Sequence, residues 1–184
     1  MKNKKNPLKL LITAVILIAA AVILVQSFCI QNFHTVQPSL LYTSAQPRGM
    51  DYTRLLYKYH IATIINLRSP AEHRERNWHN EEITWVRSNG VRYVEMPLDR
   101  DLTVPGHFPD ANMQEQFLTI MADKANLPVL VHDSSGESRV AMLSAVWLAK
   151  GCRLPAQQVL ETASEIKKSP LADPEKQFIN DMVK

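Results

Sequence analysis

The residues with the clearest chemical potential lie in one polar turn, HDSSGES, at positions 132–138. An apolar stretch precedes the turn, and a segment with helical spacing follows it. A turn between a buried strand and a helix directs backbone N–H groups inward, where they can bind an anion such as phosphate. Gly136 can adopt backbone angles that other residues avoid, and Arg139 can add a two-pronged, charge-assisted grip. Asp133 and the two serines after it would otherwise only cap the helix, and the turn alone leaves both interpretations open.

The spacing of His132, Gly136 and Arg139 after an apolar strand resembles the signature His-Cys-x-x-Gly-x-x-Arg of cysteine-dependent phosphatases. Within that class it is similar to the small dual-specificity and tyrosine phosphatase group, and the resemblance covers roughly residues 40–151. It implies a dual-specificity phosphatase-like fold, with His132 orienting the loop. The phosphate-binding loop that it implies consists of His132, Ser134, Ser135, Gly136, Glu137, Ser138 and Arg139.

In the family that the turn resembles, a Cys thiolate attacks phosphorus, the Arg binds phosphate oxygens and an Asp protonates the leaving oxygen. Here the nucleophile position is Asp133, while Val140 stands where the family usually has Ser or Thr. The candidate general acid is Asp101, 32 residues before position 133, with Asp99 as its rival. Two departures at one site fit a natural non-enzyme better than a single engineered substitution.

A carboxylate at position 133 changes the expected chemistry. It is a weaker nucleophile than a thiolate, and it would repel a phosphate by about 4 kcal/mol at ~4 Å in a medium of effective dielectric ~20. We therefore predict a pseudophosphatase with a binding or regulatory role, in which Asp133 folds into the loop as a tethered substitute for phosphate. The alternative is an active phosphomonoesterase that uses Asp133 in place of Cys. The predicted partners are a phosphorylated protein or a small phosphate ester.

No cofactor and no metal site are predicted. His73 and His79 lie six residues apart in a charged segment whose helical part is expected around residues 72–86. Metal ligands on one face of a helix need spacings of three or four. The segment is therefore interpreted as a solvated helix face.

The elements that position the turn alternate between strand-like and helix-like segments. Such alternation predicts an α/β domain with a mostly parallel central sheet flanked by helices. Strands are expected within 40–47, 61–69, 91–98 and 127–132, and helices within 50–60, 72–86, 111–125, 139–150, 154–168 and 173–183.

The amino-terminal residues 1–30 are predicted to form a membrane anchor. Four lysines in the first nine residues precede an apolar run that, extended to residue 30, has about 21 residues and just spans a ~30 Å hydrocarbon layer. A cleaved signal peptide and a buried helix are the alternatives. The lysines favour a single-pass protein with a cytoplasmic amino terminus and an extracytoplasmic domain. Residues 31–39 are expected to be a linker and 40–184 the phosphatase-like domain.

Composition excludes a nucleic-acid-binding function. Without the four anchor lysines, 17 of the 21 basic residues remain against 18 acidic residues, a net charge of about −1. No basic cluster follows in the rest of the chain, so the usual footprint of a nucleic-acid binder is missing. The only cysteines, Cys29 and Cys152, indicate neither a disulfide framework nor a metal site.

Overall fold

The computed structural model describes residues 11–18, 29–102, 104 and 106–183. The chain divides into two units, Met1–Ile30 and Gln31–Lys184. The residues of the predicted turn, its flanking strand and its flanking helix all belong to the second unit.

The prediction of an amino-terminal transmembrane helix is wrong for the part of the chain that the structure describes. Residues 11–18 are helical, and a helix of that length extends only about 12 Å, against the ~30 Å thickness of a bilayer core. Among the described residues, no helix is both long enough and apolar enough to cross a membrane. The same finding overturns the prediction of a single-pass membrane protein with a cytoplasmic amino terminus and an extracytoplasmic domain. The remainder of the predicted anchor, 1–10 and 19–28, lies outside the described residues.

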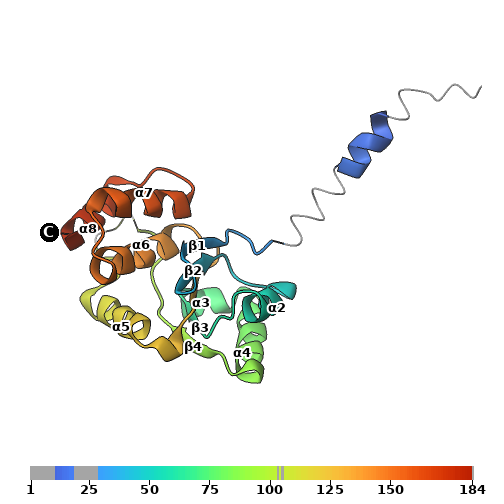
Figure 1. Cartoon of the computed structure of the whole chain (residues 1–184), viewed down its shortest axis with the longest axis horizontal. Coiled ribbons are helices and arrows are strands. Elements are labelled where there is room, and N and C mark those ends of the chain that lie inside the picture. Colours follow the sequence, from blue (N-terminus) through green and yellow to red (C-terminus); the bar gives the residue numbers. More distant parts are fainter. Residues whose placement is uncertain (1–10, 19–28, 103, 105, 184) are drawn as a thin grey trace, which may run out of the picture. The chain divides into compact units, whose positions relative to one another are not determined.

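The second unit is built on a five-stranded sheet with helices on both faces (Figure 1). The strand order is β1-β2-β5-β3-β4, and three of the four strand pairs are parallel, the exception being β1 with β2. The α/β class and the mostly parallel sheet are thus confirmed. The strands are β1 His34–Gln37, β2 Leu41–Ser44, β3 Thr63–Asn66, β4 Arg92–Glu95 and β5 Val129–His132.

Strand β1 lies within the segment predicted to be a linker. It pairs antiparallel with β2, with His34 opposite Thr43. The connection is tight, since the Leu40 N–H donates to the Gln37 carbonyl over 3.1 Å. The polar, proline-bearing sequence 31–39 therefore forms half of a hairpin, and the compact unit begins at Gln31 rather than at residue 40.

The helices differ from the expected ones mainly between residues 70 and 89. The helix expected at 72–86 is two helices, α3 and α4, separated by residues 74–77. Helix α3 begins at a capping box in which the Ser69 and Glu72 side chains each bond the other's backbone N–H. The helical elements are α2 Met50–Tyr57, α3 Pro70–His73, α4 Trp78–Asn89, α5 Ala111–Ala122, η1 Lys124–Asn126, α6 Ser138–Val146, the π-helical turn η2 Trp147–Gly151, α7 Ala156–Lys167 and α8 Asp173–Val183.

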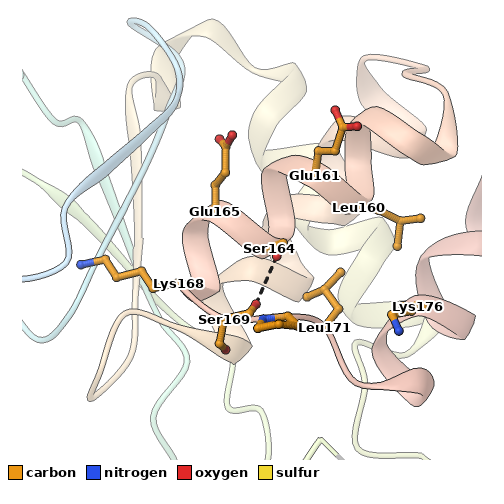
Figure 2. A pocket seen from close by; sticks show the side chains of 9 residues that line it. Leu160, Glu161, Ser164, Glu165, Lys168, Ser169, Leu171 and Lys176 are labelled. Carbon is orange, nitrogen blue, oxygen red and sulfur yellow. Dashed lines mark hydrogen bonds between the residues drawn. The ribbon is translucent and has the colours of Figure 1, made fainter.

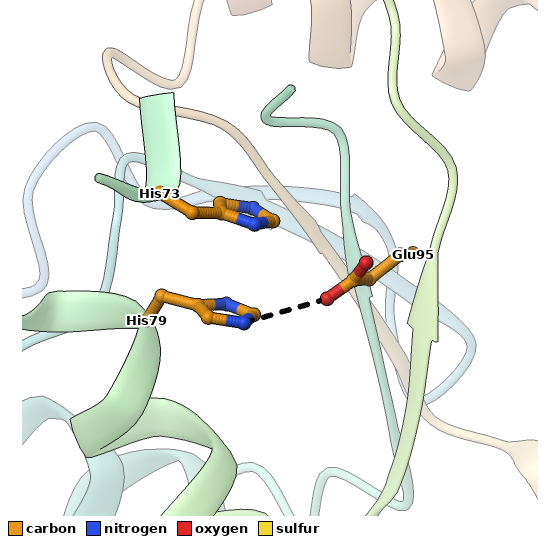
Figure 3. A group of neighbouring side chains, drawn as sticks. All are labelled: His73, His79 and Glu95. Atoms are coloured by element: carbon orange, nitrogen blue, oxygen red, sulfur yellow. Dashed lines mark ion pairs between the residues drawn. The ribbon is translucent and has the colours of Figure 1, made fainter. Parts of the chain in front are cut away.

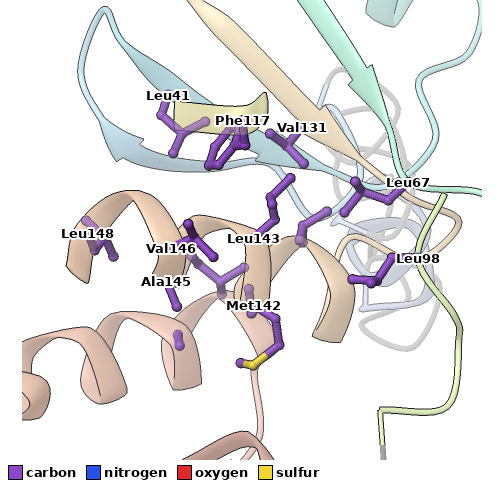
Figure 4. Close-up of a cluster of buried hydrophobic side chains, with 14 of the residues drawn as sticks. Leu41, Leu67, Leu98, Phe117, Val131, Met142, Leu143, Ala145, Val146 and Leu148 are labelled. Carbon is purple, nitrogen blue, oxygen red and sulfur yellow. The ribbon is translucent and has the colours of Figure 1, made fainter. Parts of the chain in front are cut away.

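Helix α6 is the helix that fixes the predicted turn in the core. Every residue of α6 from Arg139 to Val146 is buried. Figure 4 shows its side chains Met142, Leu143 and Val146 among apolar residues from the sheet and from α5. Because both β5 and α6 are buried, the turn between them is held at both ends.

Candidate functional site

The predicted loop lies at the carboxyl end of β5, which runs parallel to both of its neighbours, β2 and β3. Gly136 has a φ of +73°, and a Cβ added there would lie 2.3 Å from the backbone nitrogen of Ala45 and 2.5 Å from the carbonyl carbon of Ser44. Only glycine combines this backbone angle with such close approach. The loop is therefore packed directly against the chain that leaves β2.

The carboxylate of Asp133 is held by the loop itself. Its Oδ1 accepts hydrogen bonds from the backbone N–H groups of Ser135, at 2.8 Å, and Gly136, at 2.5 Å. Its Oδ2 accepts from Arg139 Nε at 3.0 Å. Asp133 is only 1% exposed. A carboxylate thus occupies the position at which the loop's donors converge.

All three nitrogens of the Arg139 guanidinium donate hydrogen bonds to other groups of the protein. Nη1 and Nη2 bind the two carboxylate oxygens of Glu72, at 2.7 and 3.0 Å, as a two-pronged pair. Nη2 also donates to Ser134 Oγ at 2.9 Å, and Nη1 lies 3.3 Å from the carbonyl oxygens of Leu67 and Leu98. With Nε on Asp133, all five N–H donors of the side chain are engaged.

The neighbouring carboxylates keep Arg139 protonated. Burial by itself would lower the pKa of Arg139, but the hydrogen bonds to Glu72 and the charge of Asp133 raise that pKa above its usual value. The guanidinium stays charged between two carboxylates.

Glu72 is a site residue that the sequence analysis missed. Its side chain is 8% exposed and also binds the exposed guanidinium of Arg100, with Oε1 2.9 Å from Nη2. Its backbone carbonyl accepts from Arg68 Nη2. The available sequence signal was Ser69-x-x-Glu72, a capping-box pattern, which indicates a helix start but not the contact with Arg139.

A pocket of about 430 Å³ opens over this arrangement. Its lining is Arg100, Asp133, Ser134, Ser135, Ser138 and Arg139. The lining contains two arginines and the Asp133 carboxylate, and Glu72 adds a second carboxylate. The positive and negative charges of the site are therefore equal in number.

The family comparison agrees with this geometry. The model of the tyrosine phosphatase family matches residues 28–147, which include the whole loop and all of helix α6. This chain belongs to the tyrosine phosphatase family.

Several solved structures share the fold of this chain. The catalytic core of the PP-IP phosphatase SIW14 from S. cerevisiae, in complex with citrate, is 18% identical, with a TM-score of 0.66, over 82% of this chain and 85% of that one. PTPMT1 in complex with PI(5)P is 16% identical, with a TM-score of 0.60, over 82% and 94%. TpbA from P. aeruginosa is 18% identical, with a TM-score of 0.59, over 82% and 84%. At these identities the likeness establishes the fold.

Within this tyrosine phosphatase family domain, the two candidate acids lie beside the pocket lining rather than in it. Asp99 and Asp101 are both exposed. Asp99 Oδ1 accepts from the Asp101 N–H at 2.9 Å and lies 3.5 Å from His107 Nδ1. The residue between them, Arg100, lines the pocket instead. The structure therefore brings Asp133 and Arg139 together but places neither candidate acid with them.

Two of the predicted loop residues, Ser135 and Glu137, contact Asn32. The Ser135 carbonyl accepts from Asn32 Nδ2 at 2.6 Å, and the same amide lies 3.5 Å from Glu137 Oε1. These contacts tie the loop of the phosphatase-family domain to the segment that precedes β1.

His132, the residue before Asp133, is fully buried. Its Nε2 lies 3.0 Å from Glu82 Oε1, although neither of these atoms makes a hydrogen bond of good geometry within the described residues. The other oxygen of Glu82 accepts from Asn66 Nδ2 at 3.1 Å. His132 thus joins the strand end to a buried polar group on α4.

A larger pocket of about 650 Å³ lies between α7 and the start of α8 (Figure 2). Leu160 and Leu171 form part of its lining, and Ser164 donates to the Ser169 carbonyl at 3.2 Å. None of the predicted site residues lines it.

Glu72 should make the stability of the domain depend on pH. Burial alone would raise the pKa of Glu72, but the hydrogen bonds and charge of Arg139 dominate and lower it from 4.5 to about 2. A carboxyl with a depressed pKa in the folded state stabilises fully above its unfolded pKa and loses that effect as the pH falls. We expect about 3 kcal/mol to be lost between pH 4.5 and 2.

Urea unfolding at a series of pH values between 6 and 2 measures this loss. Glu72→Gln should flatten the acid slope of the unfolding free energy, whereas Glu75→Gln, at a neighbouring exposed glutamate, should leave it unchanged. An equal acid slope in wild type and Glu72→Gln would assign the dependence to other groups.

Proposed function

We propose that this member of the tyrosine phosphatase family is a pseudophosphatase whose anion-binding loop is filled by its own Asp133. The observation that carries the proposal is the set of three hydrogen bonds to the Asp133 carboxylate, from two loop N–H groups and Arg139. These are the donors that a phosphate would need. The role is therefore binding or regulation rather than phosphate hydrolysis.

Two features argue against Asp133 as a nucleophile. Both of its carboxylate oxygens are already engaged, and the residue is 1% exposed. An incoming phosphate would have to displace the carboxylate from Arg139 before it could be attacked. This displacement would leave the buried carboxylate of Asp133 without its cationic partner, which is energetically costly.

The proposed partner is a phosphorylated protein or a small phosphate ester that contacts the pocket rim. Arg100, with 57% of its side chain exposed, and three loop serines provide cationic and hydroxyl groups there. The structure of PTPMT1 in complex with PI(5)P has a phosphate ester as its ligand, and SIW14, another protein with this fold, is named a PP-IP phosphatase. The carboxylate of Asp133 would keep the loop centre closed to the phosphate itself.

Removing the carboxylate should reopen the loop to an oxyanion. We expect wild-type protein to bind inorganic phosphate or vanadate weakly, and Asp133→Ser to bind it at least tenfold more tightly, because a repulsion of about 4 kcal/mol is removed. Isothermal titration calorimetry with each anion measures the difference. Asp123→Ser is the matched control, since it removes one carboxylate from an exposed cap and leaves a residue that still caps. Equal, tight binding by wild type and Asp133→Ser would contradict the proposal.

Turnover of an aryl phosphate, with and without Mg²⁺, distinguishes the alternative enzyme. Wild type should show none, and the double variant Asp133→Cys with Val140→Thr should gain partial activity, since it restores a thiolate and a nearby hydroxyl. Wild-type turnover that is abolished by Asp133→Ala would instead establish a phosphomonoesterase that uses the aspartate.

A further inference from the structure

Two histidines and a glutamate meet beside α3 and α4, away from the residues that line the loop pocket (Figure 3). The rings of His73 and His79 are stacked, with centroids 3.9 Å apart and planes 6° from parallel. His79 Nε2 lies 3.6 Å from Glu95 Oε1. One ligand atom from each of the three side chains lies within 4.8 Å of the others.

The break between α3 and α4 brings these side chains together. His73 is the last residue of α3, and His79 is the second residue of α4. On one continuous helix, residues six apart would face different directions, which is why the spacing had argued against a metal site. The turn at residues 74–77 removes that restriction. Glu95 joins them from the carboxyl end of β4.

His73 carries an unpartnered nitrogen. Its Nε2 is buried and makes no hydrogen bond within the described residues. A buried ring nitrogen without a hydrogen-bond partner remains available to bind a metal ion.

A hydrogen bond with Tyr93 can orient the imidazole of His79. His79 Nδ1 lies 3.4 Å from the Tyr93 hydroxyl, which also accepts from Asn66 Nδ2 at 2.9 Å. If Nδ1 carries the proton toward Tyr93, Nε2 presents its lone pair toward Glu95. A ligating histidine ordinarily has such a partner on its other nitrogen.

We propose that His73, His79 and Glu95 form a Zn²⁺ site with water in the fourth position. Two imidazoles and one carboxylate are a ligand set that zinc accepts, at about 2.0–2.2 Å from each atom. Ligand atoms in a tetrahedral zinc site lie about 3.4 Å apart, so zinc binding requires side chains that are free to rotate, and the stacked rings of His73 and His79 must tilt away from parallel for both lone pairs to reach one ion. The carboxylate has that freedom, because 44% of the Glu95 side chain is exposed.

A pocket of about 520 Å³, lined by both histidines, gives solvent and metal access to the site. Arg74 and Arg76 also line it and oppose a cation. Glu95 is a proposed ligand, and the buried Glu82 accepts from Asn66 Nδ2, which also donates to the Tyr93 hydroxyl beside His79. The arrangement therefore includes anionic groups to offset the two arginines.

Zinc titration of the full-length chain by calorimetry at pH 7 tests the proposal. We expect one Zn²⁺ per chain, together with a rise in Tm on addition of zinc. His79→Asn and Glu95→Gln should each weaken the affinity at least tenfold and remove most of the rise in Tm. Co²⁺ should give the absorption bands of a four-coordinate site in wild type but not in His79→Asn or Glu95→Gln.

The matched control is His60→Asn, which removes an exposed histidine whose φ of +53° asparagine tolerates, and zinc binding should be unchanged. Glu95→Gln guards against misfolding, because its side chain is on the surface. Absence of stoichiometric zinc binding by wild type, or equal affinity in the control and in folded Glu95→Gln, would overturn the proposal. The result is independent of phosphate binding at Asp133, so either proposal can fail alone.

Discussion

Arg139→Met is expected to lower the free energy of unfolding by about 3–5 kcal/mol. The variant keeps most of the side-chain volume but leaves the carboxylates of Asp133 and Glu72, which are 1% and 6% exposed, without their shared cation. Buried charges that lose a partner are far more costly than surface charges. Urea unfolding at pH 7, monitored by circular dichroism, measures the difference from wild type.

Arg100→Met is the matched control for this prediction. Arg100 binds the same Glu72 carboxylate, but 57% of its side chain is exposed, so its loss should cost no more than about 1 kcal/mol. The large effect of Arg139→Met should shrink when Asp133→Asn and Glu72→Gln are added, because the uncompensated charges are then removed. Equal effects of the two arginine variants would mean that the buried charge cluster does not govern stability.

Gly136→Ala is expected to destabilise the domain by about 3 kcal/mol or more. The added methyl would meet the backbone at Ala45 and Ser44, at 2.3 and 2.5 Å, and the φ of +73° is unfavourable for any L-residue with a Cβ. Backbone atoms cannot turn aside as a flexible side chain can, so the loop or the end of β2 must shift. Thermal and urea unfolding both report this cost.

Gly90→Ala separates the two causes. Gly90 has a similar φ of +65°, at the carboxyl end of α4, but an added Cβ would have nothing within 4 Å. Its substitution should cost only about 1 kcal/mol, from backbone strain alone. If the two alanine variants were equally stable, close packing of the loop on β2 would not be a constraint.

The loop was predictable because its signals are local. The apolar strand, the glycine and the amphipathic segment after it are consecutive in sequence, and they form β5, the turn and α6 as expected. The contact between Asp133 and Arg139 spans six residues, so the hypothesis of a carboxylate folded into the loop could be framed from the sequence.

The second carboxylate of the site was not predictable in the same way. Glu72 reaches Arg139 across 67 residues, and nothing in the spacing of its own segment indicates that contact. The stacking of His73 on His79 was not expected because the segment was treated as one helix, whereas two short helices change which residues share a face. The Ser69-Pro70 start of α3 was a usable signal, since proline favours the first turn of a helix.

The errors at the amino terminus have a related cause. Hydropathy suggested a spanning helix, but the described helical residues are too few, and polarity suggested a linker where the chain pairs as β1. Both expectations rested on composition alone. The length of a helix decides whether it can span a membrane, and strand pairing decides whether a polar segment is a linker or part of a sheet. Antiparallel pairing depends on backbone groups that a polar side chain does not remove.

The strand order constrains how the chain folds. Strand β5 is the last strand in sequence but lies between β2 and β3, so the sheet is incomplete until residues near 130 are available. The hydrogen bond from Asn32 to Ser135 closes a loop of 103 residues. Native contacts so distant in sequence form late and slowly, since the entropy of closing long loops must be overcome first. A nascent chain released before β5 would hold neither its sheet nor its anion loop, and the ribosome must deliver most of the chain before either can form.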